Sequence, residues 1–257
     1  MSIITLTSDW GLTDHYVAAV KGAILSRIPD ATIVDVSHSI TKFSISETAF
    51  VVKYAYKNFP ENSIHIVGVN SESSVDTPHI VVYYDHHYFV GADNGVFSLI
   101  CDSQPDEIFE VTVAQDTDYF TFPCRDVFAK VACHIAENKN LNTIGIKRQA
   151  INQLKSYLPV SDKNSITGIV VYFDTYDNAI TNINETIFKD VGRGRKFTVY
   201  LKNEEENRIE KSYSDVANGE IVMLFGATTH LEIAINKGSA RNLLGINIYD
   251  TVRVEFV

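Results

Sequence analysis

The chain has 257 residues, of which 45% are hydrophobic and 21% charged, and its formal net charge at pH 7 is -10. This length allows one large domain or two smaller ones with well-buried cores. The negative balance argues against a nucleic-acid partner, because a general phosphate-backbone binder needs a basic patch.

The sequence shows no sign of a membrane segment or a metal site. No apolar run approaches the roughly 20 residues that span a bilayer, and the first residues lack the basic-then-apolar layout of a signal peptide. The three cysteines, Cys101, Cys124 and Cys133, have no metal-ligand spacing, and neither do the scattered histidines. A small odd number of cysteines fits reduced thiols, so we expect a cytoplasmic protein without a membrane partner.

The first half of the chain alternates predicted strands with predicted helices. Strands are expected at 3–6, 31–36, 62–69, 79–84, 88–90 and 107–113, and helices at 16–24, 45–57, 96–100 and 127–136. The apolar run at 62–69 predicts a central strand. The dipeptide Asp85-His86 predicts a hairpin turn. This alternation indicates an α/β N-terminal domain over residues 1–158, with three layers and a mostly parallel sheet.

The pattern changes after a polar stretch at 138–164. Short strands are expected at 166–173, 179–183, 196–201, 208–213, 221–225, 231–235 and 252–257, with short helices only near 185–189 and 240–243. Turn signals lie at 203–207 and at Asn218-Gly219. Repeated short strands favour a small C-terminal β-barrel or a sandwich, and we assign residues 159–257 to a β-barrel domain.

Two carboxylates follow the first predicted strand. Asp9 and Asp14 flank Gly11 and lie close to the only tryptophan, Trp10. In an open α/β sheet, ligands bind at the carboxyl ends of the strands, where a carboxylate can accept bonds from sugar hydroxyls. Asp9 comes too early to cap the next helix, whereas Asp14 fits an N-cap and a ligand contact equally well.

Three further polar segments follow predicted strands, at 70–77, 93–94 and 174–182. Together with the first they would line a polar pocket, and because the last segment belongs to the second domain, the pocket would lie between domains or between subunits. The first turn has one glycine where a dinucleotide fingerprint needs three, and the sequence has no P-loop. We therefore expect no cofactor.

Motifs along nearly the whole chain resemble one family. They are Thr7 to Asp14 with Lys21-Gly22, Val34 to His38, Tyr88 to Gly95, Thr121-Phe122 with Arg125-Asp126, Asp174 with Asn178 and Thr181-Asn182, and Leu231 to Ala234 with Gly238 to Ala240. In this order they resemble the S-adenosylmethionine hydroxide adenosyltransferases and the related fluorinases and chlorinases.

The resemblance implies an α/β domain followed by a β-barrel, in a homotrimer with active sites at subunit interfaces. It implies S-adenosylmethionine as substrate rather than cofactor. The reaction it implies is attack by water or halide on C5′ of the ribose, with methionine leaving from the sulfonium. The leaving group is already cationic, so positioning and desolvation of the nucleophile would carry most of the catalysis.

The resemblance also implies substrate-binding residues. Asp9 matches the aspartate that binds the ribose hydroxyls, and Trp10 follows it. Asp14 and Asp174 match carboxylates that hold the methionine part. The other matches are Phe43 near the nucleoside, Asn178 and Tyr176 at the adenine, and Leu231 and Glu232 on the strand that borders the adenine.

The departures from the family pattern concern the nucleophile. The hydrolases carry aspartate, arginine and histidine at the positions of Asn70, Thr77 and Pro123. The halogenases carry aromatic residues at Asn70 and Pro123, and serine or glycine at Cys124. A different set would then position the water, and our catalytic candidates are Asn70, Glu72 and Cys124, with Ser71 beside them. We expect the Cys124 thiol to stay protonated.

The sequence leaves several functions open. The first is an S-adenosylmethionine hydrolase that forms adenosine and methionine. The alternatives are a protein that binds S-adenosylmethionine or adenosine with weak or no turnover, a halide-using relative, and an interaction module that binds neither.

Overall fold

The computed structural model describes residues 3–115, 117–138 and 140–257. The chain divides into two compact units, Met1–Lys155 and Ser156–Val257, whereas the sequence placed the domain boundary after residue 158. Among the described residues, no helix is both long and apolar enough to cross a membrane.

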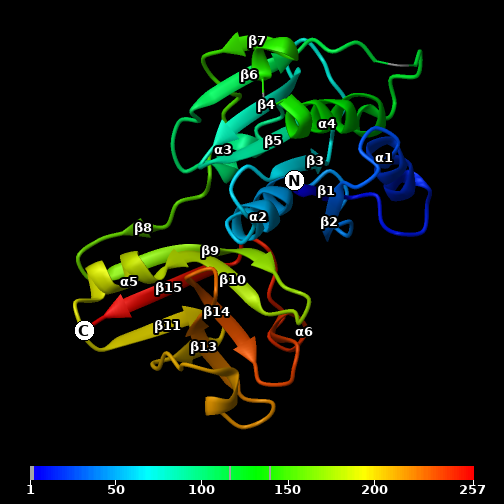
Figure 1. Cartoon of the computed structure of the whole chain (residues 1–257). Coiled ribbons are helices and arrows are strands. Elements are labelled where there is room, and N and C mark those ends of the chain that lie inside the picture. The colour runs from blue at the N-terminus through cyan, green and yellow to red at the C-terminus, as the bar shows by residue number, and fades with distance from the viewer. Residues whose placement is uncertain (1–2, 116, 139) are drawn as a thin grey trace. The chain divides into compact units, whose positions relative to one another are not determined.

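The first unit is built on a seven-stranded sheet in the order β2-β1-β3-β5-β4-β6-β7 (Figure 1). Its strands are β1 (Ile3–Ser8), β2 (Thr32–Ser37), β3 (Ile64–Gly68), β4 (His79–Tyr84), β5 (His87–Ala92), β6 (Glu107–Val111) and β7 (Gly145–Arg148). Every residue of β3 is buried, which confirms the central strand that its apolar run predicts.

The sheet is mixed, so the prediction of a mostly parallel sheet is wrong. Strands β2, β1, β3 and β5 are parallel, whereas β4, β6 and β7 join by antiparallel pairing. The cause is the two-residue turn between β4 and β5, where Asp85 and His86 have φ of 50° and 62°. So tight a turn can join only antiparallel strands. The edge strand β7 lies in the polar stretch that gave no strand signal.

Helices cover both faces of this sheet. They are α1 (Tyr16–Leu25), α2 (Ile45–Tyr56), α3 (Val96–Ile100) and α4 (Ala129–Asn138), the last preceded by a π-helical turn, Cys124–Phe128, and followed by a short 3-10 helix, Leu141–Thr143. Ile64 and Ile66 of β3 belong to the core that α1 and α4 cover, and Val67 belongs to the core under α2 and α3. The first unit thus has the predicted three layers.

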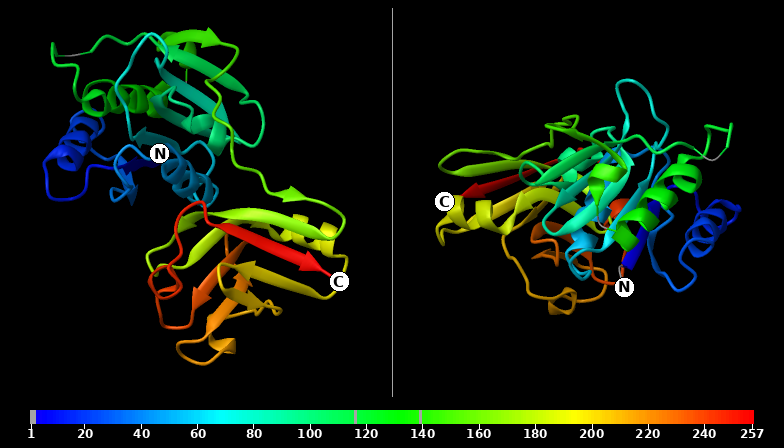
Figure 2. Two further views of the ribbon diagram at one scale, coloured as in Figure 1. Left: turned by 180° about the vertical axis from the view of Figure 1, so that it is seen from behind. Right: turned by 45° about the horizontal axis from the view of Figure 1, so that its top comes forward.

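The second unit is an antiparallel sheet that curls around its own core into a nearly closed barrel (Figures 1 and 2). The strand order is β12-β11-β15-β9-β10-β14-β13, with β8 paired to β9. The elements are β8 (Val160–Ser161), β9 (Ser165–Phe173), β10 (Ala179–Asn184), α5 (Glu185–Gly192), β11 (Phe197–Leu201), β12 (Glu204–Glu206), a 3-10 helix (Tyr213–Asp215), β13 (Ile221–Phe225), β14 (His230–Ile235), α6 (Ala240–Leu243) and β15 (Thr251–Phe256).

The strand predicted at 208–213 is wrong. A strand forms instead at β12, in residues predicted as a turn, because Lys202 adopts φ of 55° and reverses the chain early. Further on, the Asp215 carboxylate accepts bonds from the backbone N–H groups of Lys211 and Ser212, which turns the chain into a 3-10 helix. The segment predicted as a strand still makes one backbone hydrogen bond to the barrel, in which the Glu210 N–H donates to the Met223 carbonyl at 2.8 Å.

Candidate functional site

Asp9 lies directly after β1 and ties two loops together. Its Oδ2 accepts a hydrogen bond from the backbone N–H of Phe43 at 2.9 Å. Phe43 has φ of 63°, a left-handed conformation that is costly for a bulky side chain, and its ring is 71% exposed. Strained residues that the surroundings hold in place cluster at binding sites. The Asp9 carboxylate therefore helps present an exposed aromatic ring beside itself.

Trp10 rests on a firmly held histidine. The indole stacks on His38 with ring centroids 6.1 Å apart, and Phe122 packs edge-on against it at 5.3 Å. The His38 ring is fixed by Ser8 Oγ, 2.7 Å from Nδ1, and by Asp35 Oδ1, 3.1 Å from Nε2. These contacts make the Trp10 ring a rigid neighbour of Asp9.

Cys124 is buried below Trp10, and both side chains pack against Gly68; we call this packed layer the floor of the site. A Cβ atom placed on Gly68, at the end of β3, would lie 2.6 Å from Trp10 Cζ2 and 3.0 Å from Cys124 Sγ, so only glycine fits between them. Burial raises the pKa of the Cys124 thiol to about 12, and the thiol is protonated at neutral pH, as predicted. Cys124 is fully buried, so the structure does not support its predicted contact with the reacting water.

The loop that carries Asn70 and Glu72 is anchored at its base. The side-chain amide of Asn94, after β5, donates to the carbonyls of Val69 and Asn70 at 3.2 and 3.0 Å. His79 Nε2 lies 2.9 Å from the carbonyl oxygen of Ser71. Asn70 has φ of 46°, and both Asn70 and Glu72 are exposed. The two polar candidates therefore stand on a fixed turn and face solvent.

The other two positions where the hydrolases carry charged or titratable side chains have structural roles here. Thr77 Oγ1 lies 2.8 Å from Ser74 Oγ within the loop. Pro123 is buried at the start of the π-helical turn.

Asp14 is exposed in the loop before α1 and does not cap that helix. The N-cap position is His15, and no side chain makes a capping hydrogen bond there. The capping alternative for Asp14 is therefore wrong, which leaves the ligand contact as its candidate role.

In the second unit, Asp174 organises the turn between β9 and β10. Its Oδ1 accepts the backbone N–H groups of Tyr176 and Asn178, both at 2.9 Å, and its Oδ2 accepts the side-chain amide of Asn178 at 2.9 Å. This turn leaves the Tyr176 ring 77% exposed. The segment thus holds a carboxylate, an amide and an exposed aromatic ring close together.

Glu232 and Leu231 lie on opposite faces of β14, because neighbouring side chains of a strand alternate. The Leu231 side chain is fully buried in the barrel core, so only the Leu231 backbone is left for the predicted contact with the substrate. Glu232 is on the outer face, 5% exposed, and opposite Ile180 of β10. Burial raises the pKa of Glu232, and the nearby Asp174 charge adds to the rise.

Tyr213 is a member of this cluster that sequence reasoning missed. Its hydroxyl donates to Glu232 Oε1 at 2.5 Å, and burial and the Glu232 carboxylate raise the pKa of Tyr213. The signal in the sequence is the Ser212-x-x-Asp215 spacing, a capping box that starts the 3-10 helix carrying Tyr213.

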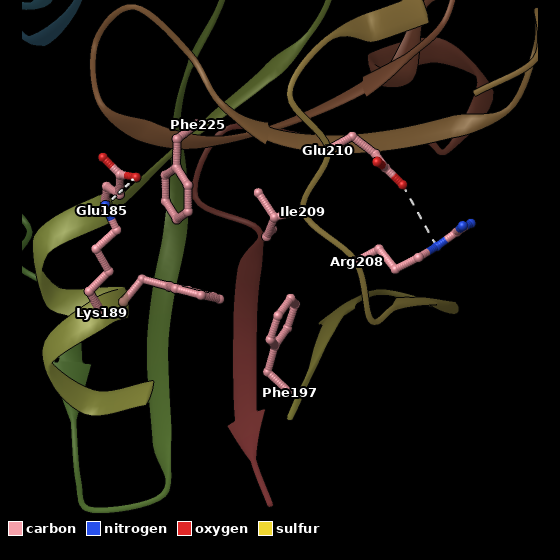
Figure 3. A pocket seen from close by; sticks show the side chains of 8 residues that line it. Glu185, Lys189, Phe197, Arg208, Ile209, Glu210 and Phe225 are labelled. Carbon is pink, nitrogen blue, oxygen red and sulfur yellow. Dashed lines mark ion pairs between the residues drawn. The ribbon is translucent and has the colours of Figure 1, made fainter. Parts of the chain in front are cut away.

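A cavity of about 420 Å³ lies elsewhere in the second unit (Figure 3). It has an aromatic floor of Phe188, Phe197 and Phe225, and its charged rim is paired within itself, Lys189 with Glu185 at 2.7 Å and Arg208 with Glu210 at 3.8 Å. None of the predicted site residues lines this cavity, so we place the candidate site at the polar clusters instead. Among the described residues, no three side chains of His, Cys, Asp or Glu could hold a metal ion together.

The sequences of known proteins resemble this chain over both units. The chain is 28% identical to an (R)-S-adenosyl-L-methionine hydrolase of Methanocaldococcus jannaschii, over 99% of this chain and 96% of that protein. A hydrolase of the same name from Thermus thermophilus is also 28% identical, over 96% of each chain. A fluorinase of an Actinoplanes species is 23% identical over 75% of each chain.

A solved structure has the same fold. The crystal structure of an uncharacterized conserved protein from Thermotoga maritima superimposes with a TM-score of 0.90 at 29% identity, covering 98% of this chain and 99% of that one. Residues 4–145 match the model of the SAM hydroxide adenosyltransferase N-terminal domain, and residues 168–253 match that of the C-terminal domain. The chain therefore belongs to the SAM hydroxide adenosyltransferase family.

Proposed function

We propose that this protein catalyses the attack of water on C5′ of S-adenosylmethionine and releases adenosine and methionine. The observation that carries the proposal is the family match in both units, with full-length relatives named as hydrolases. The water oxygen forms a bond to C5′ while the C5′–S bond breaks. The bonding pair goes to sulfur, which becomes the neutral thioether of methionine, and the water proton goes to solvent.

The proposed substrate contacts divide between the two units. In the first, Asp9 accepts the ribose hydroxyls, Trp10 and Phe43 border the nucleoside, and Asp14 faces the methionine ammonium. In the second, Asp174 pairs with the same ammonium, Asn178 binds the adenine, and the exposed Tyr176 ring lies beside it. The carboxylates suit these roles because a cationic, hydroxyl-rich ligand offers donors that charged acceptors bind most strongly.

On the nucleophile side, Asn70 and Glu72 are the groups that would orient water. An amide can direct a water molecule without removing its proton, and a sulfonium leaving group needs no acid. Cys124 would contribute by packing rather than by contact, since it is buried under Trp10.

We also propose a homotrimer in which each site combines the first unit of one chain with the second unit of the next. The support is the family membership and the presence of ligand-binding candidates on both units, with Asp9 directly after β1 and Asp174 directly after β9.

The test is incubation of the pure protein with S-adenosylmethionine, followed by chromatography. We expect adenosine and methionine in equal amounts, and no halogenated nucleoside when chloride or fluoride is added. A halogenated product would show that the protein is a halogenase and would contradict the proposed hydrolase function. Binding measured by calorimetry without any product would contradict the proposed turnover, and the absence of both binding and product would contradict every ligand-based function.

A second candidate, binding without turnover, is favoured by one observation. The positions where the hydrolases carry aspartate, arginine and histidine hold Asn70, Thr77 and Pro123, and here Thr77 bonds within its own loop while Pro123 is buried. The same incubation separates the two, because a binder gives heat but no adenosine.

A further inference from the structure

A hydrogen-bonded network on the outer face of the barrel surrounds Asn178. The pairing of β10 with β14 puts Ile180 opposite Glu232, so Asn178, two residues before Ile180, is a diagonal neighbour of Glu232 on the same face. Asn178 is 5% exposed. Its amide nitrogen donates to Asp174 Oδ2 at 2.9 Å. The Asn178 side chain also lowers the pKa of the Glu232 carboxyl, against the larger rise that burial causes, so the amide and the carboxylate interact.

Glu232 is itself held in place from two sides. The Tyr213 hydroxyl donates to Oε1 at 2.5 Å. Oε2 occupies the space that a side chain at Gly226 would fill, since a Cβ there would lie 2.5 Å from this oxygen. The carboxylate is therefore restrained at both of its oxygens, and Oε1 accepts the Tyr213 hydroxyl.

The two carboxylates fix which way the Asn178 amide points. Asp174 accepts from the amide nitrogen, and the negative Glu232 carboxylate beside it favours the same orientation, so the carbonyl oxygen Oδ1 is the atom left for a ligand. An oxygen acceptor binds the exocyclic amino group of a 6-amino purine. It repels the carbonyl oxygen of a 6-oxo purine, and a buried polar group left unpaired in this way is strongly unfavourable.

We propose that Tyr213 and Glu232 are positioning residues, which hold the Asn178 amide in one orientation so that the site selects a 6-amino over a 6-oxo purine. This inference rests on the proposed function, in which Asn178 binds the base. It assigns a role to Tyr213, which has no counterpart among the predicted site residues, and it replaces direct substrate contact by Glu232 with an action through Asn178.

The test is calorimetric binding of adenosine and inosine to the full chain, in the wild type and in Glu232→Gln and Tyr213→Phe. We expect the wild type to prefer adenosine at least tenfold. Glu232→Gln should reduce that preference about fivefold, because a glutamine amide can donate to Oδ1, although the hydrogen bond to Asp174 Oδ2 still favours the original orientation. Tyr213→Phe should reduce it a few-fold, because Glu232 loses one of its two restraints.

Matched controls are Glu205→Gln, on an exposed position of β12, and Tyr200→Phe on β11, which should leave the preference unchanged. The measured quantity is the ratio of two affinities, and a merely structural lesion would weaken both nucleosides equally. An unchanged ratio in Glu232→Gln that still unfolds cooperatively would overturn the inference. Equal wild-type binding of both nucleosides would overturn it while leaving the proposed function intact, and binding of neither would overturn both.

Discussion

At the scale of single residues, the carboxylates of the candidate site support the protein as well as offering charge. Asp9 holds the backbone of Phe43, and Asp174 accepts three hydrogen bonds from its own turn. Removing such a side chain therefore changes both the ligand contact and the local backbone. A substitution that keeps an acceptor oxygen separates the two effects.

Asp9→Ala should weaken adenosine binding by about 1.5–3 kcal/mol, the usual contribution of a hydrogen bond to a charged group. Asp9→Asn should weaken it less, because its amide oxygen still accepts the Phe43 N–H, although the charge is lost. Calorimetry with adenosine measures both, and Asp30→Ala, at an exposed carboxylate before β2, is the control. If Asp9→Ala binds adenosine as the wild type does, the ribose assignment is wrong.

Gly68→Ala should destabilise the first unit by about 1–3 kcal/mol, because the new methyl group would collide with Trp10 and Cys124. Gly22→Ala in α1 should do the opposite and stabilise by about 0.5–1 kcal/mol, since that position has open space and helices disfavour glycine. Urea unfolding followed by the fluorescence of Trp10, the only tryptophan, measures both variants. A neutral Gly68→Ala would show that the floor is not tightly packed.

At the scale of elements, the sequence predicted what depends on local pattern and failed where long-range contacts decide. The apolar run of β3 and the Asp85-His86 turn were readable because period and turn chemistry are local. Strand β7 and strand β12 were not, because pairing with β6 and β11 supplies their stability. The burial of the Leu231 side chain was not predicted for the same reason, since only the sheet register shows which face of β14 meets the core.

The central strands β1, β3 and β5 share a polar chain inside the core. Thr5 Oγ1 lies 2.7 Å from His65 Nδ1, and His65 Nε2 lies 3.1 Å from His87 Nδ1. Burial lowers the pKa of His65 to about 3, and the neighbouring His87 adds to the shift. His65 is therefore neutral in the folded protein at every pH where the protein is commonly handled.

This arrangement predicts loss of stability in mild acid. An unfolded histidine titrates near pH 6.5, so between 6.5 and about 3 the unfolded chain binds more protons than the native chain. As the pH is lowered through that window, the free energy of unfolding should decrease, by at most about 1.4 kcal/mol per pH unit from this ring. Urea unfolding at pH 7.5 and 5.0 should show a shallower dependence for His65→Gln than for the wild type or for the exposed control His15→Gln. Equal slopes would contradict the assignment.

At the scale of the whole molecule, each unit carries one part of the proposed ligand contacts. The sequence identified most of these residues through the order of the motifs. No local pattern, however, tells whether the second unit that completes a site belongs to the same chain or to another subunit. A closed ring of identical subunits with head-to-tail contacts has as many shared sites as chains. The proposed trimer would therefore have three sites, each needing an intact Asp9 from one chain and an intact Asp174 from its neighbour.

Mixing experiments distinguish shared sites from sites within one chain. At a substrate concentration well below KM, Asp9→Ala and Asp174→Ala chains should each have at most about a tenth of the wild-type turnover alone. Co-expressed, they should recover about a quarter of it, because random assembly pairs two intact halves at about one site in four. Sites within one chain would recover none. The control mixes wild type with the double variant Asp9→Ala/Asp174→Ala, which should again give about a quarter for shared sites but about half for separate ones. Sedimentation of the mixed species at three times 28.7 kDa completes the test, and a monomer with wild-type turnover would contradict the trimer.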